Sequence, residues 1–496
     1  MVTRREVLKS GAQVGATLAL PSLALAGDEQ PPHVEVNDIQ SQLNSTRVHQ
    51  IVRPASLEEI QSALRKAAAE GRAVSVAGGR HAMGGQQFGT DTLLLDMRSF
   101  NRVLRFDRDR GHIELEAGIE WPELIAWLER QQAGEAKPWG IRQKQTGVDE
   151  VSLGGSLAAN IHGRGLRFPP IISDIESFVL IDAAGRPHTC SRRENEELFS
   201  LAIGGYGLFG VIAHITLRLA PRTKVERIVQ VIPVKEFVPR VDQRIEDGFE
   251  YGDCQYSTDL QSDAESHPGV FSCYRSVPMD RPIPERQTQL SKDQWVELYR
   301  LTRTDKLKAF EVYSKYYLST AGQLYWSDSG QLAGKLDFYH EGIRQLPGAA
   351  KETEMITEAY VRREHLTPFL ADVRRDFIKH EVDPTYGTIR LIEKDEDSFL
   401  AWAREPYVCV VCNLHVVHTE AGKAKAREDF RRIIDRAIEH GGSYFLTYHR
   451  WATRKQVETC YPRFVEFLRL KRKYDPAERF QCDWYRHYKA MFADRL

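Results

Sequence analysis

The chain has 496 residues, of which 42% are hydrophobic and 28% charged, and its formal net charge is -1. This length and composition are typical of a globular protein with two or three domains, each large enough for a hydrophobic core. Because the chain lacks the basic surplus of nucleic-acid-binding proteins, we expect no nucleic-acid partner.

The N-terminus has the pattern of an export signal. Arg4 and Arg5 precede an apolar segment, residues 11–25, which ends in an A-x-A cleavage site. This segment is shorter than the ~20 residues that span a bilayer. The paired arginines are typical of a twin-arginine signal, although Val7 stands where an aromatic residue or leucine is usual. We expect residues 1–26 to be a signal peptide and the mature protein to be periplasmic, with no stable membrane span. An uncleaved amphipathic N-terminus is the alternative.

Short strands and helices follow in mixed order. Ser56 and Glu59 have the spacing of a capping box, which predicts a helix from residue 57 to about residue 70. Apolar runs and alternating patterns predict strands at 73–77, 92–96, 103–107, 113–118, 175–182, 215–219, 388–392 and 407–416. Helical patterns are found at 121–131 and between 287 and 317. The mixture favours an α+β fold over a series of equal βαβ units.

A first glycine-rich stretch is AVSVAGGRHAMGG, residues 73–85. Its buried strand ends at Gly78 and Gly79, where bare backbone N–H groups can approach phosphate oxygens and Arg80 can add charge. The turn lacks the spacing of a Rossmann or P-loop motif. An ordinary strand turn has the same pattern.

A second such stretch covers residues 146–165 and contains five glycines. Its small side chains allow backbone amides to approach a flat or charged ligand, so we interpret it as a binding loop. A tightly packed glycine loop without a ligand is the alternative.

The motifs GGRH, AGIEWPEL, VSLGGSLAANIHGRG and IGGYGLFGVIAHITLRL occur in this order. Together they closely resemble the PCMH-type FAD-binding domain of the vanillyl-alcohol oxidase superfamily, over residues 46–221. The C-terminal segment, 446–496, resembles the closing segment of aldonolactone, alditol and decaprenylphosphoryl-ribose oxidases. The resemblance implies an α+β fold in which this segment returns to the FAD-binding domain, with an antiparallel-sheet substrate (cap) domain at 222–445.

The resemblance implies FAD as cofactor, held through backbone amides of the glycine motifs. Many members carry, at the place of His81, the histidine bonded to the flavin 8α-methyl carbon, so the FAD is expected to be covalent. A histidine that only hydrogen-bonds near the cofactor is the alternative. The implied cofactor-binding residues are Ala77, Gly78, Gly79, Arg80, His81, Ala82, Met83, Gly147, Ser152, Gly154, Gly155, Ala159, Asn160, His162, Gly207, Gly210, Val211 and Ile212.

Four residues are the catalytic candidates on the same resemblance. Arg390 lies in a strand like one in alditol oxidases where an arginine meets the substrate, although Thr388 replaces the acidic residue two positions before it. His415 is a candidate base or substrate ligand. Tyr448 and His449 fall near the family's active-site lysine, which this chain lacks. A core or surface role fits each of the four as well.

The implied activity is FAD-dependent oxidation of a CH–OH group in a sugar, aldonolactone, polyol or related alcohol. Hydride would pass to flavin N5, and electrons would pass to oxygen or a respiratory acceptor. Two alternatives are an enzyme acting on a lipid-linked sugar, like decaprenylphosphoryl-ribose oxidase, and a non-catalytic flavin-binding periplasmic protein. No metal site is expected, and we interpret Cys409 and Cys412 as buried residues of a core strand.

Overall fold

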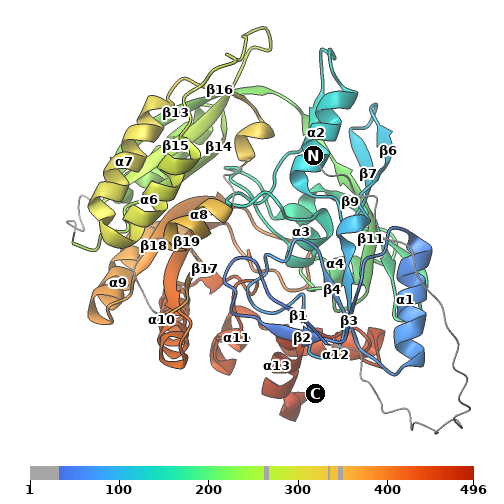
Figure 1. Ribbon diagram of the computed structural model, residues 1–496. Coiled ribbons are helices and arrows are strands. Elements are labelled where there is room, and N and C mark those ends of the chain that lie inside the picture. Colours follow the sequence, from blue (N-terminus) through green and yellow to red (C-terminus); the bar gives the residue numbers. More distant parts are fainter. Residues whose placement is uncertain (1–32, 262–266, 333–335, 345–349) are drawn as a thin grey trace, which may run out of the picture. The chain divides into compact units, whose positions relative to one another are not determined.

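The computed structural model describes residues 33–261, 267–332, 336–344 and 350–496 (Figure 1). The expected signal peptide, residues 1–26, lies outside the described residues. His33–Leu496 form one compact unit. Helices and strands are mixed throughout it, so the α+β prediction is confirmed.

The first half of the unit contains two main sheets. A parallel sheet has the order β3-β5-β4, and an antiparallel sheet has the order β10-β9-β11-β7-β6. There are also two small antiparallel sheets of two strands each, β1-β2 and β12-β8. The strands are β1 (Val34–Val36), β2 (Thr46–Val48), β3 (Gln50–Val52), β4 (Val74–Ala77), β5 (Leu93–Asp96), β6 (Val103–Asp107), β7 (His112–Glu116), β8 (Trp139–Gly140), β9 (Ile175–Ile181), β10 (Pro187–Ser191), β11 (Val211–Arg218) and β12 (Ala220–Pro221).

Helices α1 (Leu57–Ala69) and α2 (Trp121–Gln131) form where the pattern predicts them, and α4 (Glu196–Ala202) follows β10. The Ser56 hydroxyl accepts a hydrogen bond from the Glu59 amide at 3.2 Å, whereas the Glu59 carboxylate accepts from the Ala55 amide at 2.8 Å. The N-cap is therefore present, but its reciprocal bond goes to the residue before it.

The glycine-rich stretch at 146–165 differs from its prediction as a loop. Helix α3 (Leu153–Ala159) forms inside it. Ser152 is the N-cap, because its hydroxyl accepts from the Gly155 amide at 3.2 Å. Asn160, with φ near +50°, ends the helix. The Ser152 side-chain cap and the backbone N–H of Asn160, which donates to Leu157 O and Ser156 O, compensate for the low helix propensity of two glycines.

The second half is built on an eight-stranded sheet of order β16-β13-β15-β14-β18-β19-β17-β20, in which the pairings are antiparallel. Cys409 and Cys412 both lie buried on β19, as predicted. The strands are β13 (Lys224–Pro233), β14 (Phe249–Tyr256), β15 (Pro268–Val277), β16 (Leu324–Trp326), β17 (Glu352–Val361), β18 (Pro384–Ile392), β19 (Tyr407–Val417) and β20 (Ser443–Tyr444).

Helices lie on both faces of this sheet (Figure 1). On β15, Val270 packs with α6 and α7, while its neighbour Phe271 packs against Phe237 of α5 with ring centroids 5.7 Å apart. The alternation of side chains along a strand thus assigns the two helix layers to opposite faces. The helices are α5 (Phe237–Glu246), α6 (Lys292–Thr304), α7 (Lys306–Ser319), α8 (Leu336–Arg344), α9 (Leu366–Lys379) and α10 (Glu420–Glu439).

The C-terminal segment contains α11 (Arg454–Cys460), α12 (Phe464–Tyr474) and α13 (Asp483–Met491). Its backbone pairs with β4: the Val74 amide donates to Arg479 O at 2.7 Å, and the Gln481 amide donates to Val74 O at 2.9 Å. Phe480, between them, is fully buried. Residues more than 400 positions apart therefore lie beside the strand that leads into the first glycine turn.

Short 3₁₀ helices connect several elements, at Met97–Ser99, Ile171–Asp174, Val234–Glu236, Ser329–Gln331, Arg363–His365 and Ala493–Arg495. Among the described residues, no helix combines the length and apolar character needed to cross a bilayer.

Candidate active site

The turn after β4 is closely packed against the second glycine stretch. A Cβ atom at Gly78 would lie 1.9 Å from the Ser152 hydroxyl oxygen, and one at Gly79 would lie 2.1 Å from the Glu150 carbonyl oxygen. Arg80 continues the turn with φ near +60°. Only glycine at 78 and 79 lets the two stretches approach this closely.

A cavity of about 130 Å³ lies between these stretches. The backbone N–H groups of residues 78–83 donate no hydrogen bond to any described residue. By contrast, the first amides of α3 already donate hydrogen bonds within the protein. The Gly154 amide, for example, donates to Ala117 O at 2.7 Å. The turn, rather than the helix N-terminus, therefore supplies free donors for a ligand's oxygens.

Most of the predicted cofactor-binding residues line this smaller cavity: Ala77, Gly78, Gly79, Arg80, His81, Ala82, Ser152, Gly154, Gly155, Ala159, Gly207, Gly210 and Ile212. Met83 and Gly147 instead line a second, larger cavity.

Three predicted cofactor-binding residues, Asn160, His162 and Val211, line neither cavity. Asn160 donates to Asp395 at 2.8 Å and accepts from the Ile172 amide at 3.2 Å, so it ties α3 to its surroundings. Val211 packs in the core behind β4. These side chains hold the walls in place, and their contact with a cofactor stays a prediction.

The larger cavity, of about 340 Å³, lies over the eight-stranded sheet. Its walls come from residues 145–148, β14, α6, α7, β17 and β18. The two cavities share His81, Gln145 and Tyr448. They therefore meet at these side chains.

His81 at this junction is suited to act as a neutral imidazole. Neither ring nitrogen has a hydrogen-bond partner among the described residues. Burial lowers the pKa of His81 to about 4. An unprotonated ring nitrogen is therefore available at neutral pH.

Glu358 of β17 lines the larger cavity, and its carboxylate accepts a hydrogen bond from the Cys409 thiol at 3.7 Å and three shorter ones. The donors of the shorter bonds are the Tyr448 hydroxyl at 2.7 Å, the Tyr360 hydroxyl at 2.7 Å and His162 Nε2 at 2.9 Å. Burial acts to raise the pKa of Glu358, but the charge and hydrogen bond of His162, with the Tyr448 bond, lower it to about 2. The carboxylate is thus ionised and fixes Tyr448 at the junction.

Both ring nitrogens of His162 face oxygen atoms. Its Nδ1 faces the Gly163 carbonyl at 3.0 Å and its Nε2 faces the Glu358 carboxylate at 2.9 Å. The ligand-type atoms of His162, Glu358 and Cys409 lie within 4.8 Å of one another, a cluster that the sequence spacing did not indicate. Hydrogen bonds already satisfy the carboxylate there without a metal ion.

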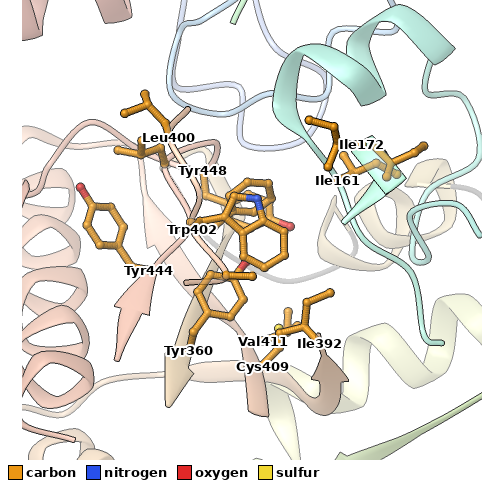
Figure 2. Packing of buried hydrophobic residues seen from close by; sticks show 14 of the residues in the cluster. Ile161, Ile172, Tyr360, Ile392, Leu400, Trp402, Cys409, Val411, Tyr444 and Tyr448 are labelled. Atoms are coloured by element: carbon orange, nitrogen blue, oxygen red, sulfur yellow. The ribbon is translucent and has the colours of Figure 1, made fainter. Parts of the chain in front are cut away.

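Aromatic packing supports this network. Figure 2 shows Trp402 beside Tyr360, with Tyr448 and Cys409 nearby. The rings of Trp402 and Tyr360 are stacked with centroids 4.6 Å apart. The close packing excludes water from the back of the network, which strengthens its charge interactions.

Arg390 of β18 lines the larger cavity and is 6% exposed. Its guanidinium makes no hydrogen bond or ion pair within the described part of the chain, and its Nε atom is buried without a partner. Arg390 therefore places a positive charge near the junction that no hydrogen bond or ion pair among the described residues balances. Such a site favours an anionic or developing negative oxygen.

His415 and His449 lie away from both cavities. His415 Nε2 is paired with Glu352 at 2.8 Å. His449 is stacked on Tyr444, and burial lowers its pKa to about 3. Of the four catalytic candidates, Arg390 and Tyr448 line a cavity, whereas His415 and His449 line neither, and the catalytic roles of all four stay predictions.

Comparison with known proteins identifies the first part of the chain. Residues 48–191 match a family described as FAD binding domain. This region is an FAD-binding domain. The PCMH-type resemblance drawn from the sequence motifs is thereby confirmed.

The relatives of this FAD-binding protein include sugar-lactone enzymes. Bovine L-gulonolactone oxidase is 27% identical over 194 residues, 39% of this chain and 42% of the relative. L-Gulono-1,4-lactone dehydrogenase of Mycobacterium tuberculosis is 29% identical over 203 residues, 40% of this chain and 45% of the relative. A putative D-arabinono-1,4-lactone oxidase of Neurospora crassa is 27% identical over 171 residues, 34% of this chain and 29% of the relative. The chain thus matches less than half the length of each.

The residues of the smaller cavity fit FAD. The free amides of residues 78–83 suit the oxygens of a diphosphate, and side chains at 78 and 79 would fill the space between the two stretches. The unpartnered imidazole of His81 stands where the cavities meet. These are the features that the FAD-binding motifs imply.

Sequence patterns missed several residues of the site, namely Lys144, Gln145, Glu354 and Glu358. Lys144 is fully buried and its ammonium group donates to Asp149 at 2.8 Å and to Gln145 O at 2.7 Å, which shapes the loop at the junction. The usable signal for the two glutamates was their spacing, since Glu354 and Glu358 are an even number of residues apart on β17 and so lie on one face of the strand.

Proposed function

We propose that this protein is an FAD-dependent oxidoreductase that oxidises a CH–OH group of a sugar lactone or a related sugar or polyol. Electrons would pass to oxygen or a respiratory acceptor. The observation that carries the proposal is the junction at His81, Gln145 and Tyr448, where a cavity walled by FAD-binding motifs meets one walled by Arg390 and Glu358. The similarity to L-gulonolactone oxidase and L-gulono-1,4-lactone dehydrogenase supports the substrate class.

The proposed architecture has two parts. Residues 46–221 and 446–496 would form the FAD-binding domain, and residues 222–445 the cap domain. The hydrogen bonds between Val74 and the backbone of residues 479–481 support the discontinuous domain. The eight-stranded sheet supports the cap.

FAD, when bound, would supply the acceptor for the hydride that leaves the carbinol carbon. Arg390 would bind the substrate oxygen and stabilise the negative charge that develops on it. The Tyr448 O–H bond points to Glu358, so its oxygen lone pairs can accept a hydrogen bond from the substrate. Burial of this network keeps water from competing for the same groups.

The location of the protein is also a proposal. The paired arginines, the apolar segment and the A-x-A site support a periplasmic protein exported after its cofactor is inserted.

The test uses the purified mature protein. We expect a flavin absorbance spectrum, which an aldonolactone such as L-gulono-1,4-lactone bleaches without oxygen. Acid precipitation should give a yellow pellet if FAD is bonded through His81, and a yellow supernatant if it is not. Protein that binds FAD but is bleached by no alcohol or sugar would contradict the activity and favour a flavin-binding role.

A further inference from the structure

The larger cavity has two chemically different ends. At the junction it presents Arg390, Glu358 and Tyr448. Away from the junction its walls are aromatic, and six of these rings form what we call the aromatic arm: Tyr256, Trp295, Tyr299, Tyr313, Tyr317 and Tyr386.

Four rings of the aromatic arm form two close pairs. The ring centroids of Tyr313 and Tyr317 are 4.4 Å apart, and those of Trp295 and Tyr299 are 6.1 Å apart. These rings lie on α6 and α7 and line the cavity, while Trp295, Tyr313 and Tyr317 also pack against the core cluster behind it. Ring faces exposed in this way attract the apolar face of another ring.

The distance between the two ends of the cavity can be estimated along strand β17. Glu358 lies near the junction, and Glu354, on the same face of the strand, lies four residues earlier. At ~3.3 Å per residue, their Cα atoms are about 13 Å apart. Because both side chains line the cavity, it is longer than one sugar ring.

The far end also offers polar groups. The Glu354 carboxyl accepts hydrogen bonds from Gln40 at 3.3 Å and from Thr385 at 2.8 Å. The Tyr339 hydroxyl lines the same cavity, where it is buried with no hydrogen-bond partner among the described residues. Aromatic faces beside a carboxyl and a free hydroxyl match a ring that has an apolar face and a hydroxylated edge, which is a sugar.

We propose that the substrate is a glycosylated sugar, whose second sugar ring binds in the aromatic arm while the first presents its CH–OH group at the junction. This inference rests on the proposed function for the oxidised end and adds the second ring. It distinguishes the substrate from a free monosaccharide lactone.

The experiment compares an aldonolactone with the same lactone carrying a β-linked hexose, as donors to the holoenzyme. We expect kcat/KM to be at least tenfold higher for the two-ring donor. Tyr299→Leu should lower kcat/KM for that donor about three- to tenfold and change it by a smaller factor for the one-ring donor. Tyr299→Phe, which keeps the ring, is the matched control, and Trp295→Leu serves if Tyr299→Leu does not fold.

Equal kcat/KM for the two donors, or an equal loss on both in Tyr299→Leu, would overturn the inference and leave the proposed function standing. Isothermal titration calorimetry tests the case in which the aromatic arm binds the second ring but the proposed oxidation does not occur. Tight binding of the two-ring compound, lost in Tyr299→Leu, without bleaching of the flavin would support the aromatic arm and contradict the oxidation.

Discussion

Glu354 is a buried carboxyl whose protonation should be visible in the stability of the protein. Burial raises its pKa from the ordinary 4.5 to about 7. Between these values the folded chain keeps a proton that the unfolded chain has released. Stability contributed by this group is therefore present below pH 4.5 and is lost as the pH rises toward 7.

We expect Glu354→Gln to remove this pH dependence. The decrease in the free energy of unfolding between pH 4.5 and pH 7 should be smaller in the variant by an amount on the order of 3 kcal/mol. Glutamine can still accept from Gln40 and can donate to Thr385, so the local hydrogen bonds survive. Urea unfolding across this pH range measures the difference, and parallel curves for the two proteins would contradict the raised pKa.

Arg390 combines burial with the absence of a partner, so its effects on stability and activity should have opposite signs. Arg390→Met removes a desolvated charge that no described residue neutralises. We expect the melting temperature to stay the same or rise, while kcat falls about 10²-fold or more. Arg390→Lys should recover part of the activity. A variant that loses stability but not turnover would show that the arginine is structural.

At the scale of elements, the contact between the two glycine stretches is the most sensitive point of the site. We expect Gly78→Ala to lose FAD, because its Cβ would lie 1.9 Å from the Ser152 hydroxyl that caps α3. The ratio of flavin to protein absorbance after gel filtration measures the loss.

Gly330→Ala is the matched control for this change. Its Cβ would make an ordinary 3.4 Å contact with Tyr325, and it lies outside both cavities. It should retain FAD fully. Retention of FAD by Gly78→Ala as well would mean that the stretches can separate without affecting the cofactor.

At the scale of the whole molecule, the C-terminal segment stabilises the strand that leads into the FAD turn. Phe480 is fully buried beside β4. We expect Phe480→Ala to lower the free energy of unfolding by about 3–5 kcal/mol and to weaken FAD retention.

Leu307→Ala controls for the removal of a large apolar side chain. Leu307 is 61% exposed, so its loss should change stability by less than about 0.5 kcal/mol. Chemical unfolding with and without added FAD measures both variants. Loss of stability without loss of FAD in Phe480→Ala would confine the role of the segment to folding.

Local patterns were enough for much of the fold. The N-cap at Ser56 predicted α1, and alternation or apolar runs predicted β4 to β7, β9, β18 and β19. Helix α3 was missed because two glycines and no apolar face hide a seven-residue helix, whose capping by Ser152 depends on the packed turn.

The sequence by itself determined the FAD-binding motifs, because glycines at 78 and 79 and at 154 and 155 are local requirements of a close backbone approach. Only the tertiary structure decided which polar side chains reach the cavities. Tyr448 and His449 are neighbours in the chain, yet one faces the junction and the other a core stack. Glu358, Arg390 and His162 meet because antiparallel pairing joins β17, β19 and β18 beneath the α3 region. Such contacts depend on strand register and long-range packing, which spacing along the chain does not encode.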